Sequence, residues 1–412
     1  MGLNWTVTLG RRTWIFAALM GLAVMAPYRC FAQEQPPPIL FPTLFHSPTN
    51  NNGYEEFVRA VDLAQTVPGI NQAMQPGATL TAKRKVINSQ QARDLFDLIK
   101  EGLQKPVRSP RTTMDSSTTF PELSGFRQVG RLLSIKIYVD FADGHVGSSI
   151  ETLKVGVEFA NRIQLDTLIS GLVGIAIETT IEKSFAQHLD QLSYFDCDAL
   201  QEVVRDRLHD ESPAARIFAR EVSLMCTMLD QSRSKVGNVV HTQDIGSEDA
   251  PTSAPIRALL ERLTTHPEEL SAAITTVETK IKQNYAIATD NVSLPVDKRK
   301  PYLHDTSNSP DAALFNALSV EPGNIVDRYS TCRSKLYLLA LHALIHKYRW
   351  EHAALPGSLD ELHRADFTID PMTGKPFTYV VKGDTYTLSG MGSVKRDENG
   401  ESLNQRDVLT VP

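Results

Sequence analysis

The stretch "FRQVGRLLSIKIYVDFADGHVGSSIETLKVGVEFA" (126–160) decides the fold class of this chain. Apolar residues recur in it every three or four positions, which places them on one face of a helix. They are Phe126, Val129, Leu133 and Ile137 in the first half, and Ile150, Leu153, Val157 and Ala160 in the second. Between the two series, "FADGHVG" (141–147) has the composition of a turn. The stretch therefore predicts a helical hairpin.

Helical patterns continue on both sides of this hairpin. A third helix is expected over residues 165–185, where Gly171 and Gly174 would let a neighbouring backbone approach closely. The segments "YEEFVRAVDLAQ" (54–65) and "NSQQARDLFDLIKEGL" (88–103) are amphipathic. Proline at the first turn marks later helices, because its missing N–H is not needed there. These prolines are Pro213, Pro267 and Pro310.

The most apolar internal run, "LISGLVGIAI" (168–177), is followed closely by Glu178, Glu182 and Lys183. A helix that spans a bilayer needs about 20 predominantly apolar residues, more than this run provides. We therefore interpret it as a buried helix.

Successive helical hairpins predict a mainly α-helical fold, either an α-solenoid resembling tetratricopeptide-type units or an irregular bundle. The sequence has no strict repeat period, so both arrangements stay open. A chain of 412 residues allows two or three domains. The expected organisation is a signal peptide at 1–32, a linker at 33–53, a helical body at 54–300, a second linker at 301–325 and a small α+β unit at 326–412.

The N-terminus has the features of an export signal. Arg11 and Arg12 precede the apolar run 13–27. Cys30 and Ala32 then occupy the −3 and −1 positions of a cleavage site. The run is short for a spanning helix, which favours cleavage after Ala32; the alternative is an anchor retained in the cytoplasmic membrane. We expect a periplasmic or otherwise extracytoplasmic protein, with membrane contact only if the anchor is retained.

Loss of the signal would leave Cys197, Cys226 and Cys332, an odd number of cysteines, so at least one thiol would stay free. The most plausible disulfide joins Cys197 to Cys226. The formal net charge of −6 gives no general attraction to nucleic acid, and no nucleic-acid partner is expected.

The C-terminal part of the sequence combines one long helix with short strands. A helix over about 326–352 is followed by Ser358 and Glu361 in capping-box spacing. Strand alternation then flanks the reversal "KGD" (382–384). Its apolar positions are Phe377, Tyr379 and Val381 before the turn, and Tyr386 and Leu388 after it. With "DVLTV" (407–411) as a third strand, the pattern predicts a long helix packed on an antiparallel sheet.

The same region carries a set of short motifs. Their residues are Tyr348, Leu355, Pro356, Ser358, Leu359, Leu362, Asp370, Pro371, Gly374, Lys375, Pro376, Tyr379, Tyr386 and Gly392. In this order they resemble the globular head of the major pseudopilins of type II secretion, over about residues 326–412. Pseudopilins begin with a prepilin-peptidase site before an apolar helix, whereas the helix here is internal, so we do not expect a pilus. The helical body resembles uncharacterised exported bacterial proteins with the same two-part layout.

The resemblance implies an envelope-facing location, a protein-interaction role and a structural calcium ion in the loop after the second strand. Asp397, Asn399 and Asp407 would supply the oxygen ligands that calcium prefers. A separate possibility is zinc at His342 and His346, which lie four residues apart on the long helix. Because Lys335 and Arg349 would repel a cation on that face, we interpret these histidines as part of a solvated polar face.

Motifs for a nucleophile elbow, a zinc protease or a phosphate-binding loop are absent from the sequence. We therefore expect an exported, non-enzymatic protein that acts as an interaction or scaffold module for a protein partner in the cell envelope. The alternative is an exported hydrolase whose acid and base residues converge from separate helices. A deep pocket with several convergent carboxylates or histidines would favour the hydrolase.

Overall fold

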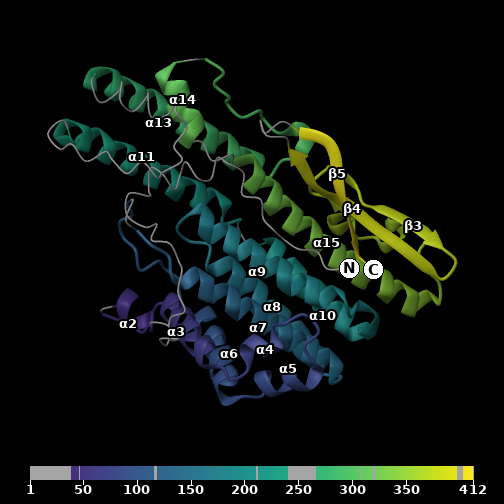
Figure 1. Cartoon of the computed structure of the whole chain (residues 1–412). Coiled ribbons are helices and arrows are strands. Elements are labelled where there is room, and N and C mark those ends of the chain that lie inside the picture. Colours follow the sequence, from purple (N-terminus) through teal and green to yellow (C-terminus); the bar gives the residue numbers. More distant parts are fainter. Residues whose placement is uncertain are drawn as a thin grey trace.

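The structure, a computed structural model, consists of a helical body with a small sheet packed on one side of it (Figure 1). It describes residues 39–45, 47–115, 118–209, 212–239, 266–307, 309–318, 322–396 and 402–411. The predicted signal peptide lies outside these residues. The chain is mainly α-helical with a small C-terminal antiparallel sheet, which confirms the predicted fold class.

The predicted hairpin is formed by α7 (Glu122–Ala142) and α8 (Val146–Arg162), and α9 (Leu168–Ala186) packs against both. The close approach expected at the glycines of α9 is confirmed at Gly174. A Cβ there would lie 2.5 Å from the carbonyl oxygen of Ala160 in α8. The apolar run of α9 is a buried helix, as predicted. Within the described ranges, no helix combines the length and apolar character that crossing a membrane requires.

Other helices close the first hydrophobic core around this hairpin. They are α3 (Gly53–Thr66), α4 (Ile70–Ala73), α5 (Leu80–Ile87), α6 (Gln90–Leu103) and α10 (Tyr194–His209). At the centre, Phe159 packs edge to face with Phe57 and Phe126, with ring centroids 5.0 and 5.7 Å away. Edge-to-face packing of this kind adds to the area that the rings bury.

The described part of the predicted linker 33–53 contains one helical turn and is attached to the body. Phe41–Leu44 form the short helix α2. The backbone N–H groups of Leu40 and Phe41 donate to the carboxylate of Asp62 at 2.8 and 2.9 Å, and Leu40 is buried. The proline-rich composition did not reveal this attachment because the carboxylate lies about twenty residues along the chain.

A second hydrophobic core lies beside the first. It is built from α11 (Ala214–Val239), α13 (Pro267–Asn291) and α14 (Pro310–Leu318). The long helix α15 (Pro322–His352) belongs to both cores, since its residues 325–332 lie in the second and its residues 336–345 in the first. Residues of α9 also contribute to both, so α9 and α15 hold the two cores together.

The C-terminal sheet has the strand order β3 (Thr378–Lys382), β4 (Thr385–Arg396) and β5 (Ser402–Val411), all antiparallel. This confirms the predicted hairpin and its third strand. The turn between β3 and β4 has two residues, and Gly383 adopts a positive φ of 59° that glycine accepts without strain. Several short elements precede the sheet or lie between helices. They are η1 (Leu189–Gln191), η2 (Val296–Lys298), η3 (Leu359–Leu362), α16 (Ala365–Thr368) and the paired strands β1 (Ile369–Asp370) and β2 (Lys375–Pro376).

The buried carboxylate of Asp370 attaches the sheet to α15. It accepts hydrogen bonds from the Ser334 hydroxyl of α15 at 2.7 Å and from the Met391 N–H of β4 at 2.8 Å. By contrast, the predicted capping box at Ser358 is wrong, because the Ser358 side chain makes no cap hydrogen bond. The Glu361 carboxylate accepts instead from the Gly357 N–H and the hydroxyl of a tyrosine in α15.

Candidate functional site

The predicted calcium ligands are described only in part. Asp397 and Asn399 lie outside the described residues. Asp407 lies in β5, but its side chain is not described. The calcium site therefore stays a prediction.

The interpretation of His342 as part of a solvated face is wrong. The sheet covers this side of α15, and His342 is only 5% exposed. The hydroxyl oxygen of Tyr386 in β4 lies 2.7 Å from its Nδ1, and the ring of His346 lies 4.7 Å away. Burial, together with a smaller effect of the neighbouring His346, lowers the pKa of His342 to about 3.

The predicted disulfide between Cys197 and Cys226 is also wrong, because both are free thiols. Cys197 lies in the first core, whereas Cys226 is half-buried on α11 beside the second. Burial raises the pKa of the Cys197 thiol to about 12, so it behaves as a small apolar side chain.

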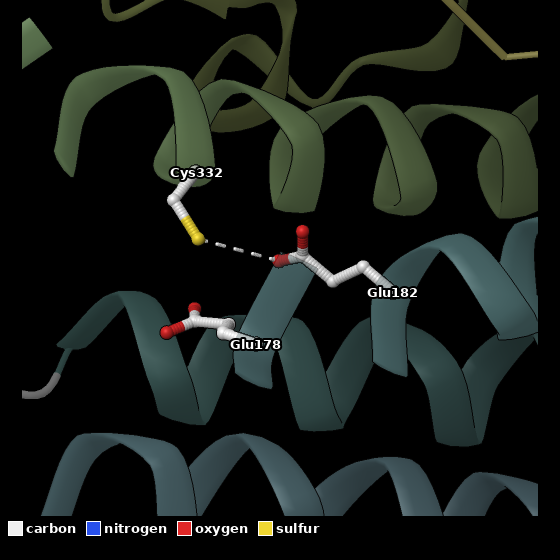
Figure 2. A group of neighbouring side chains, drawn as sticks. All are labelled: Glu178, Glu182 and Cys332. Atoms are coloured by element: carbon white, nitrogen blue, oxygen red, sulfur yellow. Dashed lines mark hydrogen bonds between the residues drawn. The ribbon is translucent and has the colours of Figure 1, made fainter. Parts of the chain in front are cut away.

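A cluster of potential metal ligands lies where α9 and α15 pack together (Figure 2). Glu178 and Glu182 are four residues apart and so face the same side of α9, and Cys332 faces them from α15. One donor atom from each of the three side chains lies within 4.8 Å of the other two. All three residues are buried.

The three side chains differ in their partners. Glu178 forms an ion pair with Arg207 of α10, with 3.2 Å between Oε2 and Nη2. The Cys332 thiol donates to Oε1 of Glu182 at a long 3.9 Å, drawn as the dashed line in Figure 2. The other oxygen of Glu182, Oε2, is buried without a hydrogen-bond partner among the described residues.

The environment of this cluster disfavours additional charge. Burial raises the pKa of the Glu182 carboxyl well above its usual range, and the nearby Glu178 carboxylate raises it further. Lys335 and Arg207 offset part of this effect. Burial likewise raises the pKa of the Cys332 thiol. A neutral Glu182 and a neutral thiol are therefore expected beside the ion pair of Glu178.

A cavity of about 50 Å³ adjoins the cluster. Its lining includes Glu178, Arg207, Ser212, Tyr329, Ser330 and Cys332. A space of this size holds a water molecule or an ion, whereas pockets for organic ligands occupy several hundred Å³. The cavity thus suits a small inorganic species.

Sequence reasoning missed this cluster because it treated Glu178 and Glu182 only as charges that end an apolar run. The available signal was the pair of acids at i and i+4 on a helix whose other residues are mostly apolar. Cys332 lies 150 residues beyond Glu182, so no local pattern could join it to them.

The C-terminal sheet presents a second feature, the outer edge of β3. In the strand order β3–β4–β5, β3 pairs with β4 on one side and with no strand on the other among the described residues. Val380 and Val381 in this strand are 44% and 39% exposed. An exposed edge with apolar side chains is a template for pairing with another strand.

Comparison with known protein families, curated proteins and solved structures finds no match to this chain.

Proposed function

We propose that this protein is an exported, non-enzymatic interaction module that binds an extended segment of a cell-envelope protein along β3. The single observation that carries the proposal is the open edge of β3 with its two exposed valines. Proteins usually protect such edges with charges, prolines or covering segments. In β3, only Lys382 at its end provides a charge.

The hairpin geometry indicates which backbone groups a partner strand would meet. In a two-residue hairpin, the residues that flank the turn form a hydrogen-bonded pair, here Lys382 with Thr385. Pairs alternate along an antiparallel ladder, so the next pair, Val381 with Tyr386, is not hydrogen-bonded. The N–H and C=O of Val381 therefore point away from β4, toward an added strand.

Two exposed aromatic side chains belong to helix ends that hydrogen bonds link to this hairpin and to each other. Arg349 in the last turn of α15 donates to the carbonyl of Asp384 at 3.4 Å. The next residue, Trp350, is 66% exposed, and Phe195 at the start of α10 is 80% exposed. The Tyr194 hydroxyl, beside Phe195, donates to Glu351 at 2.7 Å, which keeps the two helix ends together. Aromatic side chains of this kind commonly anchor protein interfaces.

The location in the envelope is supported by the sequence of the N-terminus, with Arg11 and Arg12 before an apolar run and small residues before Gln33. The pseudopilin-like motifs in the α15–sheet unit support a protein partner over a small-molecule substrate. Two convergent carboxylates, Glu178 and Glu182, are of the kind that a hydrolase would use. The cavity beside them is too small for an organic substrate, which speaks against this alternative.

The experiment compares Val381→Pro with Val381→Ala in the tagged full-length protein. Proline removes the outward N–H of Val381 without removing a bond to β4, whereas alanine trims the side chain and keeps that N–H. Envelopes are gently crosslinked, and partners captured by each variant are quantified by mass spectrometry. Removing α15 and the sheet is no substitute, because α15 belongs to both cores.

Binding through the edge predicts that wild type and Val381→Ala capture the same protein, and that Val381→Pro loses it while its melting temperature stays close to that of Val381→Ala. Equal capture by all three proteins would exclude pairing along β3. Loss in both variants would assign the contact to the valine side chain and overturn the strand-pairing proposal.

A further inference from the structure

The cluster of Glu178, Glu182 and Cys332 places two carboxyl groups and a thiol together in the protein interior, which ordinary packing of apolar side chains does not explain. Carboxylates are rarely fully buried, and buried ones normally satisfy their oxygens with hydrogen bonds. Glu182 is only 3% exposed, yet its Oε2 has no partner among the described residues. A buried oxygen in this state normally has a partner, which is either an ordered water or an ion.

The donor atoms already lie near the spacing that a metal ion requires. Zinc binds carboxylate oxygen at about 2.0–2.2 Å and thiolate sulfur at about 2.3 Å, which sets an O···S separation of about 3.5 Å in a tetrahedral site. Between Cys332 Sγ and Glu182 Oε1 the distance is 3.9 Å. All three donors lie within 4.8 Å of one another. Side-chain rotations that move the donor atoms by about an ångström would therefore bring all three to bonding distance from one ion.

The charges around the cluster also fit a divalent ion. Two carboxylates and one thiolate together carry three negative charges when they act as ligands. A divalent ion supplies two positive charges, and Arg207, paired with Oε2 of Glu178, supplies the third. The charges of the three ligands, the ion and Arg207 would then balance, which avoids the penalty for an uncompensated charge in the interior. Lys335, whose charge also acts on Glu182, is only partly buried and adds a positive charge at the border of the site.

We propose that Glu178, Glu182 and Cys332 bind one divalent ion of the zinc class between α9 and α15. A thiolate ligand favours zinc and related metals over magnesium or calcium, which prefer oxygen alone. The adjoining cavity of about 50 Å³ leaves room for water as a fourth ligand. Because α9 and α15 both contribute to the two cores, the ion joins the helices that hold these cores together. This site is independent of binding along β3.

The test uses full-length protein that has been stripped with a chelator and titrated with Co²⁺, then with Zn²⁺ in competition. Cobalt bound to a thiolate absorbs in the near ultraviolet, which reports on the sulfur ligand directly. The variants are Cys332→Ser, which removes the thiolate, and Glu182→Gln, which keeps the side-chain shape and removes the anionic ligand. The matched controls are Cys226→Ser on α11 and Glu221→Gln, a buried acid on α11 whose carboxylate accepts from the Leu168 N–H.

The proposal predicts one Co²⁺ per chain with thiolate absorption, displaced by Zn²⁺. Cys332→Ser abolishes the absorption, and Glu182→Gln weakens binding at least tenfold, while both controls behave as wild type. If Cys332→Ser does not fold, Glu182→Gln still decides the question. Wild-type protein without thiolate absorption, or unchanged cobalt affinity in Glu182→Gln, would overturn the proposal and leave the cluster as a neutral buried acid beside a thiol.

Discussion

Acidification should weaken the packing of the C-terminal sheet on α15 through His342. This imidazole lies between α15 and β4, with the Tyr386 hydroxyl 2.7 Å from its Nδ1. Burial lowers its pKa to about 3, with a further contribution from His346. In the unfolded chain the same group has an ordinary pKa of about 6.5.

The sign of the effect follows from these two pKa values. Between pH 6.5 and 3 the unfolded chain binds a proton at His342 that the folded chain does not bind. The contribution of His342 to the free energy of unfolding is therefore fully present above about pH 6.5 and decreases as the pH falls. One pH unit corresponds to about 1.4 kcal/mol, so the loss reaches about 2 kcal/mol at pH 5. That is a large part of the 5–15 kcal/mol that typically stabilises a domain.

The assay compares wild type with His342→Gln by urea unfolding at pH 7.5 and pH 5. Glutamine does not titrate, and the other ionisable groups are common to both proteins, so they largely cancel in the difference. Whatever the substitution costs at pH 7.5, the free energy of unfolding of wild type should fall relative to the variant by about 2 kcal/mol at pH 5. The same difference between the two proteins at both pH values would refute the assignment of a buried, neutral His342.

Three further outcomes follow from the packing. Gly125→Ala should destabilise the protein by about 1–3 kcal/mol in thermal unfolding, because its Cβ would lie 2.1 Å from a valine methyl of α3. Gly147→Ala is the control, since a Cβ there meets nothing within 4 Å; a similar loss in both variants would contradict the reasoning. Arg299→Met should lower the free energy of unfolding by about 3–5 kcal/mol, because it removes the cation that faces the buried carboxylate of Asp327, and a change below about 1 kcal/mol would show that the pair is dispensable. Iodoacetamide should label Cys226 before the two buried thiols of the described chain, as followed by mass spectrometry of the native protein; equal labelling of all three would contradict their burial.

The parts of the fold that were predictable depend on neighbours in sequence. The helical hairpin followed from apolar residues three and four apart, and the helix starts at Pro267 and Pro310 followed from the backbone chemistry of proline. The strands β3 and β4 followed from alternation around a glycine turn. Each of these signals acts within a few residues, so one sequence was sufficient to read it.

The errors share a different cause, which is that a polar residue says little about whether it faces water. His342 was assigned to a solvated face because lysine and arginine lie on the same helix, but the sheet that covers it comes from residues more than forty positions later. Asp62 was not expected to hold the N-terminal segment because its partners precede it by about twenty residues.

The Glu178–Glu182–Cys332 cluster combines both problems, and it also shows what a sequence can still offer. Two acids at i and i+4 on a mostly apolar helix cannot both be solvated if that helix is buried, so one of them needs a cation, a proton or a metal ion. Arg207 meets that requirement for Glu178. Oε2 of Glu182 has no hydrogen-bond partner among the described residues, and Cys332, which α15 brings to this acid pair, makes a metal ligand set an alternative to a protonated acid. The burial of an acid pair is therefore predictable from sequence, whereas its chemistry depends on the helix that packs against it.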